Sequence, residues 1–347
     1  MHFASDNAGP THPKILEAVI EASSGYAMPY GADRWAEAAK AEIRETFEAP
    51  EAEIFFIATG TATNSMILGA LAAPWSAIFC HERAHILIDE SNAPEFFTNG
   101  ARIAPVGGAA GKMDPKQLDA MLSRYAPGDI HTPAQGPVSI TNVTEAGTVY
   151  KLPEIDAIST IAAEKSLALH LDGARFGNAC AALGCSAAEM SWKRGVAAVS
   201  FGGTKNGCMS VEAAIFFDRD LARNFERIRM RSGHLFSKHR LLSAQMSAYL
   251  KDGLWLDLAG RANAAAADLA SALGNHVEFA NQPEANMLFV TFPRALHRKL
   301  RAAGAQFYSF GNAEEGPDDA PLLARLVCDW SATPENTERF ATLLKAG

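Results

Sequence analysis

One lysine stands among small residues at the end of an apolar run, in the stretch SFGGTKNG. A lysine forms a Schiff base only if its amine is neutral part of the time, which burial or nearby positive charge promotes. The flanking Gly202, Gly203 and Gly207 would leave room for a planar ligand beside Lys205. A nucleotide phosphate loop fits less well, because it needs the order G-x-x-x-x-G-K-[ST].

A carboxylate and a guanidinium precede this lysine in the stretch LHLDGARFGNA. Asp172 ends a run of apolar residues, and Arg175 follows three residues later. An aspartate in this position can cap the next helix. It can also hold a cationic ring nitrogen in a poorly solvated site, and the lysine at the end of the next apolar run favours this second interpretation.

Alternating β-rich and helical stretches are expected to position these side chains. Helical patterns separate most of the β-rich runs, which predicts a mostly parallel sheet covered on both faces. The last two runs are close enough for a hairpin. Residues 221–260 are predicted to form long helix and residues 261–347 a smaller α/β unit, with a loop at 311–321. The seven predicted strands lie within residues 53–60, 76–80, 101–107, 137–143, 167–175, 197–205 and 213–218.

Ligands of such sheets bind outside the carboxyl ends of the strands. The polar residues that leave these ends are therefore the candidates for chemistry, and their convergence carries more weight than any single motif. They are Gly60, Thr61, His81, His85, Thr144, Glu145, Asp172, Arg175, Thr204 and Lys205.

The stretch CHERAH also matches the zinc-protease pattern H-E-x-x-H. That pattern binds zinc only on a helix, where histidines four residues apart share a face. His81 instead follows an apolar strand, and ILID after His85 is β-like. A zinc hydrolase is therefore the alternative from another class, and no metal site is predicted.

Composition excludes several other classes of protein. A formal charge of −8 and a pI of about 5.7 disfavour nucleic acid or an anionic membrane as the main partner. The first residues show no signal-peptide pattern, and no apolar run is long enough to span a membrane. Five cysteines, an odd number, suit reduced thiols and a cytoplasmic protein.

Together, the Asp-x-x-Arg pair, the lysine stretch and the opening Ser5-Asp6-Asn7 resemble the pyridoxal-phosphate (PLP) enzymes of fold type I. Among these, the chain resembles the low-specificity L-threonine aldolases, through FASDNAGP, YGAD, TGTATN, AHILIDE, DIH and ARLVCDW. The resemblance implies a large PLP-binding domain, residues 1–250, and a small C-terminal α/β domain, residues 251–347. It also implies cleavage of L-threonine, L-allo-threonine or phenylserine to glycine and an aldehyde, with a PLP-dependent β-eliminating lyase as the runner-up.

The resemblance assigns cofactor contacts to residues of this chain. Lys205 would bond covalently to the cofactor, and Asp172 would keep the pyridinium nitrogen protonated. His85 would stack on the ring. Gly60 and Thr61 would offer backbone N–H groups to the phosphate at a helix start, with Thr204 as a lesser candidate.

The resemblance also assigns contacts to the substrate. Ser5 and Arg325 would bind its carboxylate, and Arg175 would lie near the phenolic oxygen of the cofactor or the same carboxylate. His85 is the first candidate for the base that takes the β-hydroxyl proton, and His131 near the substrate side chain is the second.

The same family shares its active sites between subunits. A homodimer or homotetramer is therefore expected, with Arg231 or Lys238 of a neighbouring subunit at the phosphate. Residues 142–145 depart from the family pattern, because Asn-Val-Thr-Glu stands where many relatives carry Glu-Asn-Thr-His. This departure leaves the substrate preference open.

Overall fold

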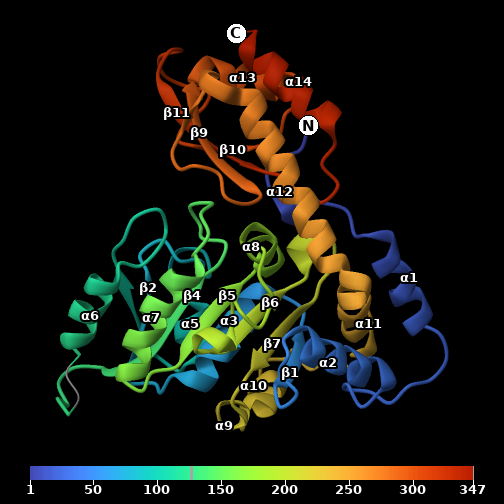
Figure 1. Cartoon of the computed structure of the whole chain (residues 1–347), viewed down its shortest axis with the longest axis vertical. Helices are drawn as coiled ribbons and strands as arrows, with labels where there is room; N and C mark the ends of the chain where they lie inside the picture. The colour runs from blue at the N-terminus through green and yellow to red at the C-terminus, as the bar shows by residue number, and fades with distance from the viewer. Residues whose placement is uncertain (126–127, 347) are drawn as a thin grey trace.

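A seven-stranded sheet forms the larger part of the molecule (Figure 1). The computed structural model describes residues 1–125 and 128–346. The strand order is β1-β7-β6-β5-β4-β2-β3, and β7 alone runs antiparallel to its neighbours. The predicted sheet and the β6–β7 hairpin are confirmed. The strands are β1 (Glu53–Ile57), β2 (Ser76–His81), β3 (Arg102–Val106), β4 (Ala134–Thr141), β5 (Leu169–Gly173), β6 (Val196–Gly202) and β7 (Glu212–Phe216).

Helices cover both faces of this sheet, which is why its central strands are apolar throughout. Alternate residues of β1 show the two faces. Ile54 and Phe56 join the core under α2, α6, α7 and α8, whereas Phe55 and Ile57 pack against α3. The helices before residue 220 are α1 (Pro13–Ala22), α2 (Arg34–Thr46), α3 (Gly60–Leu71), α4 (His85–Ile88), α5 (Ala93–Phe97), α6 (Pro115–Ser123), α7 (Leu152–Glu164) and α8 (Phe176–Leu183).

The long helix predicted for residues 221–260 is wrong, because the chain breaks it three times, first between residues 222 and 225. Gly233 has φ +75°, and Asp252 and Gly253 have φ +56° and +69°, which are left-handed values that a helix cannot continue. Four helices result: α9 (Arg219–Ala222), α10 (Phe225–Arg231), α11 (Arg240–Leu250) and α12 (Leu254–Leu273).

A second, four-stranded antiparallel sheet forms the smaller part, in the order β10-β11-β9-β8. Phe3, at the other end of the chain, lies in its core. The predicted loop at 311–321 joins β10 to β11, and the division at residue 250 remains a prediction. The elements are β8 (Glu278–Phe279), β9 (Met287–Pro293), β10 (Tyr308–Phe310), β11 (Pro321–Val327), α13 (Arg294–Ala302) and α14 (Pro334–Lys345).

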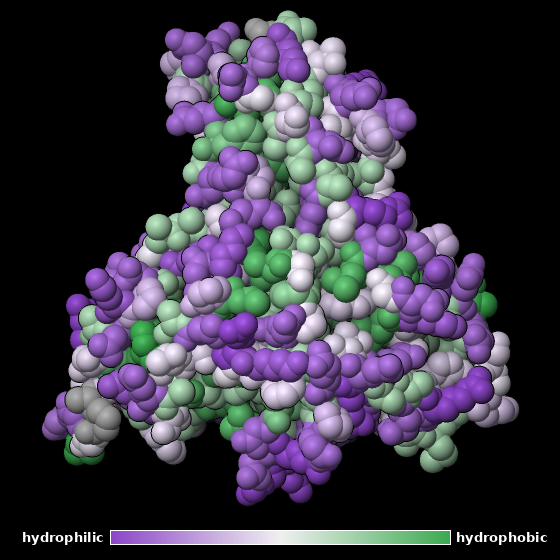
Figure 2. Space-filling view, viewed as in Figure 1, coloured by the Kyte–Doolittle hydropathy of each residue, from purple (hydrophilic) through white to green (hydrophobic). Residues whose placement is uncertain are grey.

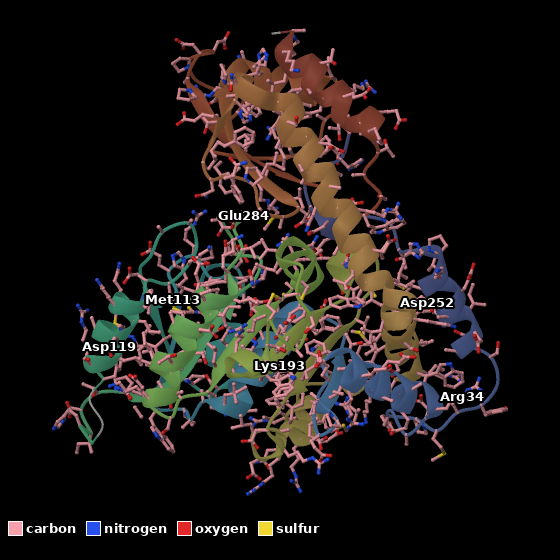
Figure 3. The ribbon with its side chains drawn as sticks, in the orientation of Figure 1. Arg34, Met113, Asp119, Lys193, Asp252 and Glu284 are labelled. Carbon is pink, nitrogen blue, oxygen red and sulfur yellow. The ribbon has the colours of Figure 1, made fainter. Side chains whose placement is uncertain are left out.

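Helix α12 joins the two parts, with its start in the large core and its end in the small one (Figure 1). Glu284 adds a polar contact at the junction (Figure 3). Its carboxylate accepts the N–H of Val149 at 2.6 Å and lies 2.9 Å from the Lys151 ammonium. Figure 2 shows a largely hydrophilic face, with hydrophobic side chains gathered just below this junction. Among the described residues, no helix is long and apolar enough to cross a membrane.

Candidate active site

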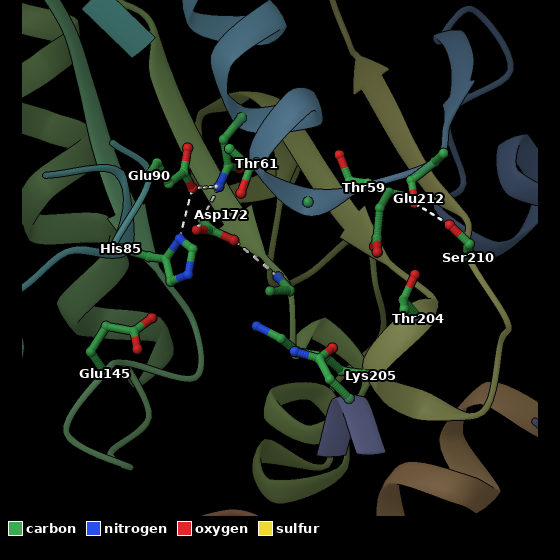
Figure 4. A pocket seen from close by; sticks show the side chains of 15 residues that line it. Thr59, Thr61, His85, Glu90, Glu145, Asp172, Thr204, Lys205, Ser210 and Glu212 are labelled. Atoms are coloured by element: carbon green, nitrogen blue, oxygen red, sulfur yellow. Dashed lines mark hydrogen bonds and ion pairs between the residues drawn. The ribbon is translucent and has the colours of Figure 1, made fainter. Parts of the chain in front are cut away.

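A cavity of about 280 Å³ lies at the carboxyl ends of β1, β2, β4, β5 and β6 (Figure 4). The elements that follow these strands supply most of its lining, because parallel strands end at the same edge of the sheet. The predicted residues that line it are Gly60, Thr61, His85, Glu145, Asp172, Thr204 and Lys205.

Lys205 and Asp172 reach this cavity from neighbouring strands. Lys205 lies in a short 3₁₀ turn directly after β6, and Asp172 lies near the end of β5. Asp172 is 2% exposed, and its carboxylate accepts the Asn64 side-chain amide at 2.9 Å and the Ala174 N–H at 3.1 Å. These two donors fix the carboxylate inside the cavity.

The glycines around the lysine have a different role from the one predicted. A Cβ at Gly202 would lie 2.6 Å from the carbonyl oxygen of Ala174, and one at Gly203 would lie 2.8 Å from that of Val211. Gly207 has φ +97°. The space beside these glycines is therefore filled by the chain itself, and the residues shape the turn that presents Lys205.

Helix α3 starts at the opposite wall of the cavity. Thr59 caps it, and its hydroxyl accepts the Ala62 N–H at 3.3 Å. Gly60 and Thr61 form the first turn, and the position beside the Gly60 Cα is open, with no atom within 4 Å of an added Cβ. Unpaired N–H groups and the helix dipole make such a start a site for an anion.

His85 belongs to a chain of buried hydrogen bonds that the sequence analysis missed. Its Nδ1 lies 2.8 Å from Glu90, and Glu90 also accepts the Asn64 amide at 3.0 Å. The hydrogen bond to Glu90 raises the pKa of His85, although burial opposes the shift. Asn64 therefore joins the His85–Glu90 pair to Asp172 (Figure 4).

The local structure around His85 differs from the prediction in one respect. The sequence predicts a β-like stretch at ILID after His85, but His85–Ile88 form the short helix α4. Glu90 comes after the C-cap Asp89, and its carboxylate lies against the His85 ring. The stretch AHILIDE contains both residues, and their separation by only five positions is the sequence signal that could have indicated this pair.

Arg175 is held by a partner that the sequence analysis did not assign. Its Nε and Nη2 donate to the Asp6 carboxylate at 2.6 and 2.9 Å, and both side chains are buried. Burial acts to raise the pKa of Asp6, but Arg175 and Lys205 hold it below its usual value. Arg175 and Asp6 thus form an ion pair without net charge beside the cavity. The role of Arg175 towards a ligand stays a prediction.

Arg325 has a buried side-chain N–H group without a hydrogen-bond partner among the described residues. Its Nη2 donates to the carbonyl oxygen of Ala4 at 3.1 Å, but its buried Nε has no hydrogen-bond partner. Burial and the charge of Arg175 both lower the pKa of Arg325. A bound carboxylate would satisfy this donor and offset the like charge. Ser5 lies nearby in sequence, where its hydroxyl accepts the Asn7 N–H at 3.2 Å.

Six predicted site residues are not among those that line this cavity: Ser5, Arg175, Arg325, His131, Arg231 and Lys238. His131 precedes β4, at the end of the strand opposite the cavity, and is exposed. It therefore does not line the cavity of its own chain, and its predicted place near the substrate remains a prediction. Arg231 lines a separate hollow beside Phe96, and Lys238 lies between α10 and α11. Their predicted role in a neighbouring subunit is untested.

The zinc-protease pattern is not built as a zinc site. His81 ends β2, and its ring bonds the Gly108 carbonyl oxygen and the Arg83 N–H. His85 starts α4 and bonds Glu90, so the two histidines do not share a helix face. No cluster of three possible ligand residues occurs in residues 1–125 and 128–346.

The fold and a cavity lined by a lysine and a buried aspartate define an enzyme of the fold type I class. The chain belongs to the beta-eliminating lyase family, whose model matches residues 2–294. It is 41% identical over 98% of its length to a low specificity L-threonine aldolase of Pseudomonas aeruginosa, of which it covers 95%. The identity to the corresponding enzyme of a Pseudomonas species is 39%, with 99% and 97% covered.

A solved structure extends this likeness to three dimensions. The threonine aldolase of Leishmania major matches with a TM-score of 0.92 at 28% identity, over 99% of this chain and 98% of that chain. The expected fold class and the family resemblance are therefore confirmed.

Proposed function

We infer that the protein is a PLP-dependent aldehyde-lyase that cleaves L-threonine to glycine and acetaldehyde. Its relatives over the full length are low specificity L-threonine aldolases. One observation carries the chemistry: a lysine, a buried aspartate and a helix start line the same cavity. Phenylserine and L-allo-threonine are proposed further substrates.

The residues present fit the cofactor. Asp172 is a buried carboxylate suited to a cationic ring nitrogen, and Lys205 supplies the amine for its aldehyde. Gly60 and Thr61 would bind the phosphate through their backbone N–H groups, with Thr204 beside them. Bound PLP supplies an acceptor for the electrons of the breaking Cα–Cβ bond.

The remaining side chains orient the substrate and move its proton. The unmet Nε of Arg325 would bind the substrate carboxylate, together with Ser5. His85 would take the β-hydroxyl proton, with Glu90 fixing the ring and stabilising its protonated form. General-base catalysis of this kind contributes about 10²- to 10⁴-fold.

We further propose that the active unit is a homodimer or homotetramer. Arg231 or Lys238 of a neighbouring subunit would complete the phosphate site. The support for this proposal is the family resemblance and the exposed position of both residues on α10 and the segment after it. A cytoplasmic location likewise remains a prediction.

Product analysis tests the proposed function. The purified protein is expected to be yellow and to release glycine and an aldehyde from L-threonine, L-allo-threonine and L-phenylserine. Lys205→Ala should lose both the colour and the activity. Release of ammonia and pyruvate from L-serine without glycine from L-threonine would instead identify a β-eliminating lyase.

A further inference from the structure

A buried carboxyl group, Glu212, lies on the wall of the cavity near the start of α3. It is the first residue of β7, is 6% exposed, and accepts the Gly203 N–H at 3.0 Å. It lines the cavity on the same side as Thr59, Thr204 and Ser210 (Figure 4). Neither the sequence motifs nor the mechanism above uses it.

A charged Glu212 would conflict with the ligand expected at this wall. The first turn of α3 offers N–H groups to a phosphate, and an ionised carboxylate at the same wall would repel that phosphate. A protonated carboxyl group would instead donate a hydrogen bond to a phosphate oxygen. The protonation state of Glu212 therefore decides whether this wall attracts or repels the anion.

The surroundings of Glu212 favour the neutral form. Burial raises its pKa to about 7, although Thr204, the Gly203 N–H and the Lys205 ammonium each lower it. Asp172 adds a like charge from β5. The other titratable groups that it influences are the buried Cys208 and Tyr249, and burial raises the pKa of both.

We propose that Glu212 binds the cofactor phosphate as a neutral carboxyl group, with one proton lying between a carboxyl oxygen and a phosphate oxygen. When the free site holds an ionised Glu212, phosphate binding takes this proton from the solvent. The inference rests on the proposed function, because it needs a phosphorylated ligand. According to this proposal, the affinity for the phosphate depends on pH through the Glu212 side chain.

The competing explanation is that Glu212 only braces the turn before Lys205. Its bond to the Gly203 N–H could do that in either protonation state. Glutamine at position 212 keeps an oxygen for this bond and a neutral donor for the phosphate, but it cannot titrate. Glu212→Gln therefore separates the two roles without removing the brace.

Calorimetric titration of the full-length chain with pyridoxamine 5′-phosphate tests the proposal. This ligand carries the phosphate but no aldehyde, so a Schiff base with Lys205 does not contribute. Above about pH 7.5, the dissociation constant of the wild type should rise up to about tenfold more per pH unit than that of Glu212→Gln. Titrations in two buffers of different ionisation enthalpy should show about one more proton taken up by the wild type.

Two controls identify the group and the ligand part responsible. Glu145→Gln removes another carboxylate of the cavity and should keep the steep pH dependence of the wild type. Pyridoxamine, which lacks the phosphate, should show no difference between the wild type and Glu212→Gln.

Equal pH slopes and equal proton uptake in the wild type and Glu212→Gln would overturn the proposal. So would weaker binding of Glu212→Gln by a constant factor at every pH, since that result indicates a charged carboxylate paired with a cation. Proton uptake by the wild type is measured independently of any variant, so a misfolded variant does not remove the test. If the wild type binds no pyridoxamine 5′-phosphate, the proposed cofactor fails with the inference.

Discussion

The contact between Glu90 and His85 gives the most informative perturbation of the proposed base. Glu90 is 4% exposed and lies 2.8 Å from the imidazole Nδ1, so its carboxylate stabilises the protonated ring that forms when His85 accepts a proton. Glu90→Gln keeps the size of the side chain but removes this charge. The Asn64 amide still finds an oxygen acceptor at position 90.

The expected size follows from the worth of a hydrogen bond to a charged group, about 1.5–3 kcal/mol. If the whole bond is made only when His85 is protonated, its loss lowers kcat by about 10- to 150-fold. The sign of the pH effect is also fixed. Glu90 raises the pKa of His85 in the folded enzyme, so the variant should lose its activity at a lower pH on the acid side than the wild type.

The assay is retro-aldol cleavage of L-threonine, followed by aldehyde release across a pH series. Glu95→Gln is the matched control, because Glu95 is a carboxylate on α5 with a buried oxygen that has no hydrogen-bond partner. It should leave both kcat and the acid limb in place. If the activity of Glu90→Gln declines at the same acidic pH as the activity of the wild type, the assignment of His85 as the base that Glu90 assists is refuted.

Three further predictions concern stability and binding. Gly202→Ala places a Cβ 2.6 Å from the Ala174 carbonyl oxygen and should lower the free energy of unfolding, measured by denaturant titration, by about 1–3 kcal/mol. Gly260→Ala is the control in open space on α12, and it should raise the free energy of unfolding by about 0.5–1 kcal/mol. In the folded protein Glu212 has a pKa of about 7, so it contributes stability that is full below its unfolded pKa and is lost as the pH rises through 7. Between about pH 4.5 and about pH 8, the free energy of unfolding of the wild type should therefore fall by on the order of 3 kcal/mol relative to that of Glu212→Gln. Parallel curves of unfolding free energy against pH for the two proteins would contradict this. Arg325→Lys should raise the KM for L-threonine about tenfold, since an ammonium lacks the fork that binds a carboxylate, and an unchanged KM would show that Arg325 does not bind the substrate.

The sequence predicted the large sheet well because its strands are buried on both faces. Such strands are continuous apolar runs, and each ends in a polar residue at the same edge of the sheet. Lys205, Asp172 and His85 could therefore be assigned to one cavity from the sequence. The helix breaks at Gly233 and Gly253 were missed, since a glycine within a helical pattern does not reveal its φ value.

Contacts between distant parts of the chain were beyond the sequence. Asp6 and Arg175 are 169 positions apart, and no periodicity brings them together. His131 shows a related limit, because a motif match says which residues recur but not at which end of a strand the loop lies. The glycines beside Lys205 show the same limit: their small size predicts close packing but not whether a ligand or the backbone fills the space.

Chemical trapping of the cofactor tests the central claim most directly. Borohydride reduction of the yellow protein, followed by peptide mass mapping, should place a phosphopyridoxyl group on Lys205 and on no other lysine. An unmodified Lys205, or the label on a different lysine, would contradict the account of this site.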